Sequence, residues 1–392
     1  MMMLFENAKI IFPDGITEGC VAVENGKIKT AGEGPAGKPD KTINCGGRYL
    51  APGFVELHTH GAGGADFMDG TAAAYETACL THLAHGTTTV LPTALSSTKE
   101  EILRSIDAFQ AAKQALEGRG PELYGLHLEG PYLSPKQAGA MPKSCLRAPA
   151  PEEYEEILSY GKGIIKRWTF AVELAGAAQF AKRLREEGIL PSVGHSDAEY
   201  SEVLEAYHHG VTHVTHLFST MSTIKRVGGF RHSGLLESAF CIPEMTVEVI
   251  ADGCHIPPEL LNMTYRLKGA ERTALVCDSM RCAGQDVKES VIGSPENGTP
   301  CIIEDGVAKL TDRSAFAGSV ATDDRLVRTM VQQAGVPLYD AVKMMTLTPA
   351  EIIGIGDRKG SIEEGKDADL IIFDDNINIE AVYAGGECLW QK

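Results

Sequence analysis

Apolar segments and helix-like segments alternate through the middle of the chain, and this alternation limits the fold more than any other feature. Eight candidate strands follow one another from FVELHTH to TALVCDS, with GTTTVLPT and LYGLHLEG among them. Helix-like segments such as AAYETACLTHLAHG lie between them and often end in glycine, as helix C-termini do. Such alternation is typical of parallel α/β folds, either a (β/α)8 barrel or a doubly wound sheet, and eight repeats favour the barrel.

The two ends of the chain differ from this middle. Both consist of short apolar runs separated by Asn-Gly and other glycine-rich turns, which is the pattern of β-hairpins. We expect residues 1–51 and 357–392 to form one small β-sandwich domain built from both termini. Residues 52–356 should form the (β/α)8 barrel, and a barrel of about 250 residues plus a small domain fits a chain of 392 residues.

Composition narrows the class of protein. Hydrophobic residues make up 43% and charged residues 23%, as in globular enzymes. A formal net charge of −17 does not favour binding to nucleic acid or to an anionic membrane. Ten cysteines without a C-x-x-C pair favour reduced thiols and a cytoplasmic location, and no signal peptide or membrane-spanning run is evident.

Polar side chains gather where the predicted strands end. In a barrel these C-terminal strand ends form the active site. They carry His58 and His60, His127 and Glu129, His195, His216, Asp252 and His255, and Asp278. Imidazole and carboxylate ligands suit zinc or ferrous iron, so we expect a metal site here. Glu129 can bridge two ions in such a site, and Asp278 can serve both as a ligand and as a base.

Several motifs among these residues also match a known family. They are APGFVELHTHGAGG, HLEGPYLSPKQAGA, GHSDA, VTHLFSTM, IADGCHI, AGS at 317–319, and TPAEIIGI followed by KGSIEEGKDADLIIFD. They span residues 50 to 374 in the family's order, and the HLEGP and THLF blocks are the most specific. The chain resembles the N-acetylglucosamine-6-phosphate deacetylase family of the amidohydrolase superfamily, which implies a (β/α)8 barrel with a small β-sandwich.

The resemblance also implies roles for individual residues. The metal ligands would be His58, His60, Glu129, His195, His216 and Asp278, holding two ions of zinc or iron, with Asp278 as the catalytic acid and base. Arg231 and His255 match the family's phosphate-binding residues. In that family the arginine reaches in from the neighbouring subunit, which implies a homodimer.

Three positions on the substrate side depart from the family pattern. Met141 replaces a histidine near the reacting carbonyl, and Ser219 and Thr220 replace Asn-Ala at a sugar phosphate contact. We therefore expect a metal-dependent amide hydrolase that removes the N-acetyl group of N-acetylglucosamine 6-phosphate. The alternatives are a hydrolase for a related N-acyl compound, in which an apolar pocket accepts another acyl group, and an inactive metal-binding scaffold.

Overall fold

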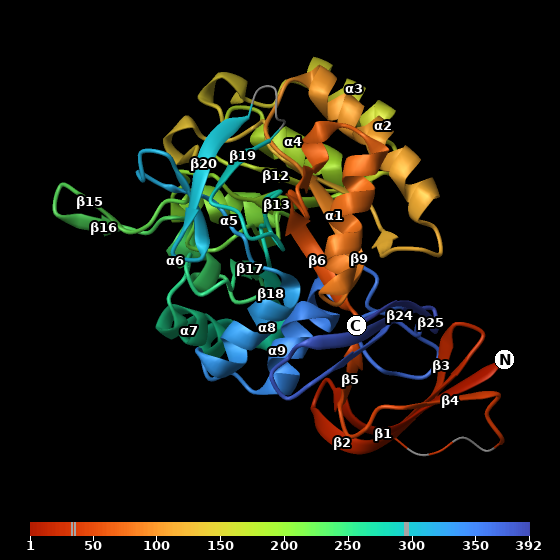
Figure 1. Cartoon of the computed structure of the whole chain (residues 1–392). Helices are drawn as coiled ribbons and strands as arrows, with labels where there is room; N and C mark the ends of the chain where they lie inside the picture. Colours follow the sequence, from red (N-terminus) through yellow and green to blue (C-terminus); the bar gives the residue numbers. More distant parts are fainter. Residues whose placement is uncertain (33, 35–36, 294–297) are drawn as a thin grey trace.

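Eight parallel strands form the barrel that the sequence predicts (Figure 1). The computed structural model describes residues 1–32, 34, 37–293 and 298–392. The barrel strands are β6 (Phe54–Thr59), β9 (Thr87–Ala94), β11 (Leu126–Glu129), β12 (Ile165–Phe170), β13 (Leu190–Val193), β14 (His213–Val214), β17 (Thr246–Ile250) and β18 (Thr273–Val276). They pair in this order, and the short β10 (Glu122–Leu123) also pairs with β9. The predicted (β/α)8 fold is confirmed.

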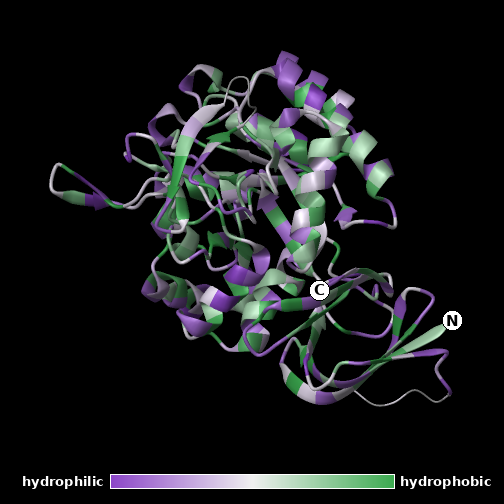
Figure 2. Cartoon of the chain, viewed as in Figure 1, coloured by the Kyte–Doolittle hydropathy of each residue, from purple (hydrophilic) through white to green (hydrophobic). Residues whose placement is uncertain are grey.

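Helices surround these strands on the outside (Figure 1). They are α1 (Ala72–Ala84), α2 (Lys99–Leu116), α3 (Pro151–Tyr160), α4 (Ala177–Glu186), α5 (Tyr200–His208), α6 (Leu235–Cys241), α7 (Pro258–Lys268), α8 (Asp323–Gln332), α9 (Leu338–Met345) and α10 (Leu347–Ile352). Helix α2 shows how they pack, because Ile102, Ile106 and Phe109 recur at helical spacing and are all buried. Hydrophilic residues occupy other positions of the same helix (Figure 2).

Strands β6 and β18 close the barrel through a few bonds. The backbone N–H of Asp278 donates to the carbonyl of His58 at 2.9 Å. Next to it, the buried Glu56 carboxylate accepts the N–H groups of His58 at 2.7 Å and of Cys277 at 2.9 Å. A side chain therefore adds to the backbone bonds at the seam, and it holds together the two strands that lead to His58 and Asp278.

A second, eight-stranded sheet combines the two ends of the chain. Its strands are β1 (Met2–Phe12), β2 (Gly15–Glu24), β3 (Lys27–Gly32), β4 (Lys41–Asn44), β5 (Tyr49–Pro52), β23 (Leu370–Phe373), β24 (Ile379–Ala384) and β25 (Glu387–Gln391). Strand β23 pairs with β5, so both termini lie in one sheet beside the barrel (Figure 1). The domain boundaries at residues 51/52 and 356/357 remain predictions.

Two insertions stand out from the barrel. The hairpin of β15 (Lys225–Val227) and β16 (Phe230–His232) projects far from the rest of the chain (Figure 1). The second insertion is a four-stranded sheet that follows β18, made of β19 (Glu289–Ile292), β20 (Thr299–Glu304), β21 (Val307–Leu310) and β22 (Phe316–Gly318). Across the described ranges, helices are too short or too polar to cross a membrane.

Candidate active site

Four histidines and two carboxylates meet at the C-terminal end of the barrel, as the sequence predicts. His58 lies in β6 and His60 just beyond it, while Glu129 is the last residue of β11. His195, His216 and Asp278 each follow the end of their strand by two residues. The barrel brings these six side chains together because parallel strands all end at the same rim.

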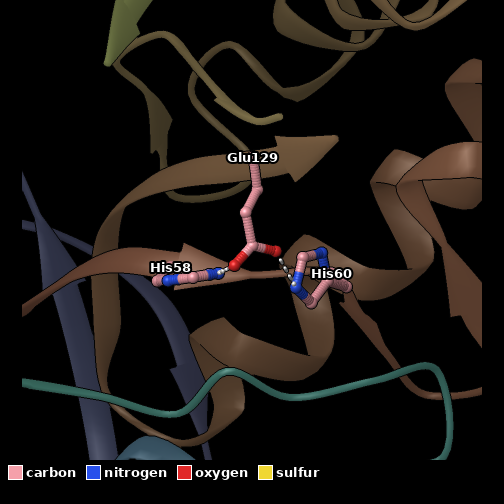
Figure 3. A group of neighbouring side chains, drawn as sticks. All are labelled: His58, His60 and Glu129. Carbon is pink, nitrogen blue, oxygen red and sulfur yellow. Dashed lines mark ion pairs between the residues drawn. The ribbon is translucent and has the colours of Figure 1, made fainter. Parts of the chain in front are cut away.

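The carboxylate of Glu129 is the centre of this group. Its Oε1 atom lies 2.9 Å from Nε2 of His216, 3.1 Å from Nε2 of His195 and 3.5 Å from Nε2 of His58. Its Oε2 atom lies 3.3 Å from Nε2 of His60, and Figure 3 shows the side chains of His58 and His60 facing the carboxylate of Glu129. Four imidazole nitrogens therefore converge on one buried carboxylate.

Asp278 joins the same group from the opposite side of the barrel seam. Its Oδ1 atom lies 3.1 Å from Nε2 of His60 and 3.6 Å from Nε2 of His58. Burial alone would raise the pKa of this carboxyl, but the neighbouring His58 and His60 lower it below its ordinary value. Burial also opposes ionisation of Glu129, and His58 with the other imidazoles holds its pKa well below the usual range. Both acids are therefore carboxylates.

Backbone carbonyls fix which ring nitrogen of two histidines carries the proton. Nδ1 of His195 lies 2.8 Å from the carbonyl oxygen of Gln137, and Nδ1 of His60 lies 3.2 Å from that of Thr93. A carbonyl oxygen only accepts hydrogen bonds, so each Nδ1 donates. In the neutral rings the lone pair is then on Nε2, which is the form that binds a metal.

This donor set fits a divalent cation. Two Nε2 atoms, of His195 and His216, lie 3.1 Å apart and face the same carboxylate oxygen. Nε2 of His58 is buried and has no hydrogen-bond partner among the described residues. Ring nitrogens and carboxylate oxygens at these distances need either protons or a cation between them. Two groups of ligand atoms that share Glu129 are close enough together to hold a cation each. The first is His58, His60 and Glu129, and the second is Glu129, His195 and His216.

A buried ion pair between Glu248 and Arg167 holds His58 in place. Sequence reasoning did not predict it. Nδ1 of His58 donates to Oε1 of Glu248 at 2.7 Å, and Oε2 of Glu248 accepts from the Arg167 guanidinium at 2.6 Å. All three side chains are fully buried. Burial opposes the charge of Glu248, but Arg167 and His58 hold its pKa well below the ordinary value. The signal in the sequence was Glu248 as the one charged residue of β17, and Arg167 beside Lys166 in β12.

Backbone strain is concentrated at this site. Ten non-glycine residues of the described chain have a positive φ, and five of them surround the site, namely His195, His216, Phe218, Thr220 and Asp278. The left-handed region is unfavourable for such residues, so the surrounding structure must hold them there. The surrounding fold thereby holds His195 and His216 in an unfavourable backbone conformation in which their side chains face the carboxylate of Glu129.

A cavity of about 580 Å³ opens above the six side chains. Met141, Ser219, Thr220 and His255 all line it, and their role as substrate contacts stays a prediction. Thr220 Oγ1 is buried and has no partner among the described residues, so it is free to bond a ligand. His255 is oriented by Asp252, whose carboxylate accepts from its Nδ1 at 2.7 Å.

Arg231 is the one predicted site residue that lies away from this cavity. It sits on the projecting β16 strand, it is exposed, and it bonds the carbonyl of Gly229 in its own hairpin at 3.0 Å. Lys143, a possible substitute for the missing histidine at Met141, is also exposed and does not line the cavity. The described lining residues include no lysine or arginine at all.

Comparison with known proteins is consistent with this geometry. The Amidohydrolase family model matches residues 49–389. The N-acetylglucosamine-6-phosphate deacetylase of Bacillus subtilis (strain 168) is 32% identical, over 91% of this chain and 89% of its own. The N-acetylgalactosamine-6-phosphate deacetylase of Shewanella sp. (strain ANA-3) is 31% identical, over 100% of this chain and 96% of its own.

A solved structure matches along almost the whole length. The crystal structure of the Pasteurella multocida N-acetylglucosamine-6-phosphate deacetylase has a TM-score of 0.89 and 28% identity, and covers 99% of both chains. Sequence and structure thus agree over both the barrel and the terminal sheet. The chain is a hydrolase that acts on amide bonds, and it belongs to the N-acetylglucosamine-6-phosphate deacetylase family of amidohydrolases.

Proposed function

We propose that the protein removes the N-acetyl group of N-acetylglucosamine 6-phosphate, giving glucosamine 6-phosphate and acetate. The observation that carries this proposal is the Glu129 carboxylate within 3.5 Å of four imidazole nitrogens, with Asp278 beside them at the floor of a cavity. A volume of about 580 Å³ lies within the usual range for small-molecule sites and suits a sugar phosphate. The names of the relatives support the same substrate class.

The amidohydrolase family implies a divalent metal, and the donor set described above fits one. We infer two ions of zinc or iron. His58, His60, Glu129 and Asp278 would hold the first, and Glu129, His195 and His216 would hold the second. When bound, such ions supply Lewis acidity, which makes water more acidic and the amide carbonyl more electrophilic.

The residues of the chain would then do the proton transfer. Asp278 is a carboxylate at the cavity floor, so it can take the proton of the attacking water as the water oxygen bonds the acetamide carbon. The carbon–nitrogen bond breaks next, and Asp278 returns the proton to the leaving amine. Acetate and the free amino sugar are the products, and Asp278 is a carboxylate again.

The phosphate group needs a cation that one chain does not supply. His255 lines the cavity, but neither lysine nor arginine does so among the described lining residues, and the net charge is −17. The hairpin carrying Arg231 projects outward and leaves Phe230 and Val227 at its tip 77% and 55% exposed. We infer that the hairpin packs on a second copy of the chain in a homodimer, and that Arg231 completes the neighbouring phosphate site. An Arg fork suits phosphate oxygens.

Acetate release from a panel of substrates tests the proposal. The panel should contain N-acetylglucosamine 6-phosphate, its galacto epimer and the unphosphorylated sugar, each with metal-replete protein. We expect the gluco phosphate to be the preferred substrate, with kcat/KM of about 10⁴ M⁻¹s⁻¹ or more. No acetate from either phosphate would overturn the proposal, and a preference for the epimer would correct its substrate.

A second candidate function rests on the apolar part of the cavity wall around Met141. This side chain cannot donate a hydrogen bond, and Lys143 does not line the cavity in its place. The cavity wall also contains Leu95, Met280 and Ile292. These residues favour an N-acyl compound with a larger apolar acyl group. Faster release of a longer acid than of acetate from matched amino sugar phosphates would select this function.

A further inference from the structure

A third group of potential metal ligands lies outside the active-site cavity. His82 comes from α1, Cys277 directly follows β18, and Asp323 begins α8. One ligand atom from each lies within 4.8 Å of the other two, and all three residues are buried. None of them lines the cavity above the active site. The group therefore lies outside the cavity, where α1, the end of β18 and the start of α8 meet.

The hydrogen bonds of this group are incomplete. Nε2 of His82 is bonded to the Thr59 hydroxyl at 2.8 Å, which leaves Nδ1 free. That Nδ1 atom lies 3.5 Å from Oδ2 of Asp323. Neither Nδ1 of His82 nor Oδ1 of Asp323 has a hydrogen-bond partner among the described residues. Buried polar atoms are rarely left in this state, because each costs about 1–3 kcal/mol.

The charge of the group is also unbalanced. Asp323 is fully buried, and in the described part of the chain its one ion pair is with His82. Its Oδ2 atom also accepts from the Thr87 hydroxyl. A cation would balance the charge of Asp323 and satisfy the two atoms that lack partners.

We propose that His82, Cys277 and Asp323 bind a further divalent ion of the zinc type. Nitrogen, sulfur and carboxylate oxygen are the ligands of zinc, and three protein ligands leave one tetrahedral position for a further ligand. The 3.5 Å between Nδ1 of His82 and Oδ2 of Asp323 is close to the ~3.3 Å expected for two ligands on one tetrahedral ion. The ion would join α1, the end of β18 and the start of α8.

This site would act on catalysis only through position. Thr59, which bonds His82, lies between His58 and His60, and Cys277 precedes Asp278. An ion bound here would fix the two strands that carry part of the active site, while its own ligands stay out of contact with the cavity. It is therefore separate from the ions of the proposed function, and its presence does not depend on the substrate.

Cobalt(II) offers a specific test, because only the proposed site has a cysteine ligand. The whole protein, produced in cobalt-supplemented medium, should show a thiolate-to-cobalt charge-transfer band in the near ultraviolet. Cys277→Ser should abolish this band and lower the metal content by one ion per chain. Matched variants of a buried cysteine (Cys282→Ser) and of the cavity-lining cysteine (Cys145→Ser) should keep it.

A variant of the active site separates this proposal from the proposed function. His195→Gln with His216→Gln should lose active-site metal and activity but retain the thiolate band. Absence of the band in the unaltered cobalt protein would overturn the proposal, whichever variants fold. A band that survives Cys277→Ser would overturn it too.

Discussion

At the level of single residues, Asp278 is placed by its backbone as well as by its side chain. Its φ of 45° lies in the left-handed region, and its N–H donates to the carbonyl of His58 at 2.9 Å. Its own carbonyl accepts the N–H of Ser319 at 3.1 Å. Asparagine tolerates the left-handed region well and has the same shape, so it is the appropriate replacement.

We predict that Asp278→Asn keeps the fold and at least one metal ion but loses most turnover. An amide cannot accept the proton of the attacking water, and removal of a general base typically lowers the rate by about 10²–10⁴-fold. Steady-state kinetics give kcat, while thermal unfolding and elemental analysis control for the fold and for bound metal. A near-normal kcat in a metal-loaded variant would assign the base elsewhere.

The buried pair of Glu248 and Arg167 makes a different prediction. Glu248→Gln leaves the Arg167 guanidinium without a counter-charge, which should destabilise the fold by about 3–5 kcal/mol. It also weakens the acceptor for Nδ1 of His58, so metal affinity should fall by about 10–100-fold. Chemical denaturation and metal titration measure the two effects.

A double variant separates those two effects. Glu248→Gln with Arg167→Met removes the unpaired charge and should recover much of the stability, since apolar replacement of a buried pair is often neutral. It should not recover the metal affinity, because His58 still lacks its charged partner. Parallel recovery of both quantities would show that Glu248 acts on the metal only through folding.

Met141 allows a test of substrate preference. Met141→His restores a hydrogen-bond donor at the cavity wall, and for N-acetylglucosamine 6-phosphate it should improve kcat/KM by up to the equivalent of about 1–3 kcal/mol. Met141→Leu is the matched apolar control and should leave kcat/KM within a few-fold of the parent. If the unaltered protein already prefers N-acetylglucosamine 6-phosphate at ordinary efficiency and histidine adds nothing, the missing donor has no consequence.

At the level of elements, the sequence predicts the barrel well because both faces of its strands are buried. Strands such as β9 and β18 are buried along their whole length, and the first polar residues after them fall at the rim where ligands gather. This is why six site residues could be named from strand ends and motifs. Glu248 was not predicted, because the sequence does not reveal which residue pairs with an acid inside a strand. Only the folded structure places Arg167 against it.

The four-stranded insertion after β18 was not predicted from the sequence. Its strands, such as β19 and β21, are three to six residues long and mix exposed with buried positions, so they lack clear alternation. Ile292 and Phe316 from this sheet nevertheless line the cavity, and Phe316 packs against His255 at 4.9 Å between ring centroids. Part of the substrate wall was therefore not predictable from strand ends.

The β15–β16 hairpin carries the prediction about phosphate. Arg231→Ala should raise KM about ten- to a hundredfold for a phosphorylated substrate, since a charged hydrogen bond is worth about 1.5–3 kcal/mol. The unphosphorylated analogue should be affected little. Arg226→Ala, directly opposite in the hairpin, is the matched control for loss of one positive charge. Equal effects of Arg231→Ala on both substrates would exclude a phosphate role.

At the level of the whole molecule, the proposed phosphate site of one chain needs a cation from a second chain. Its cavity contains Glu101, Glu129 and Asp278, and its described lining residues offer histidine but no lysine or arginine. The overall charge of −17 adds to the repulsion of a phosphate ester. If the Arg231 guanidinium serves a neighbouring chain, as proposed, assembly and substrate recognition should depend on each other.

Mixed dimers test this dependence directly. In a dimer of one Arg231→Ala chain and one Asp278→Asn chain, the first chain has an intact Asp278 and receives Arg231 from the second, so one of the two sites is complete. Random pairing of equal amounts makes half of the dimers mixed, and about a quarter of all sites should then be active. The assay must use phosphorylated substrate well below KM, where each parent dimer is nearly inactive. If Arg231 served its own chain, every site in the mixture would lack one residue, and the mixture would be no more active than the average of the parents.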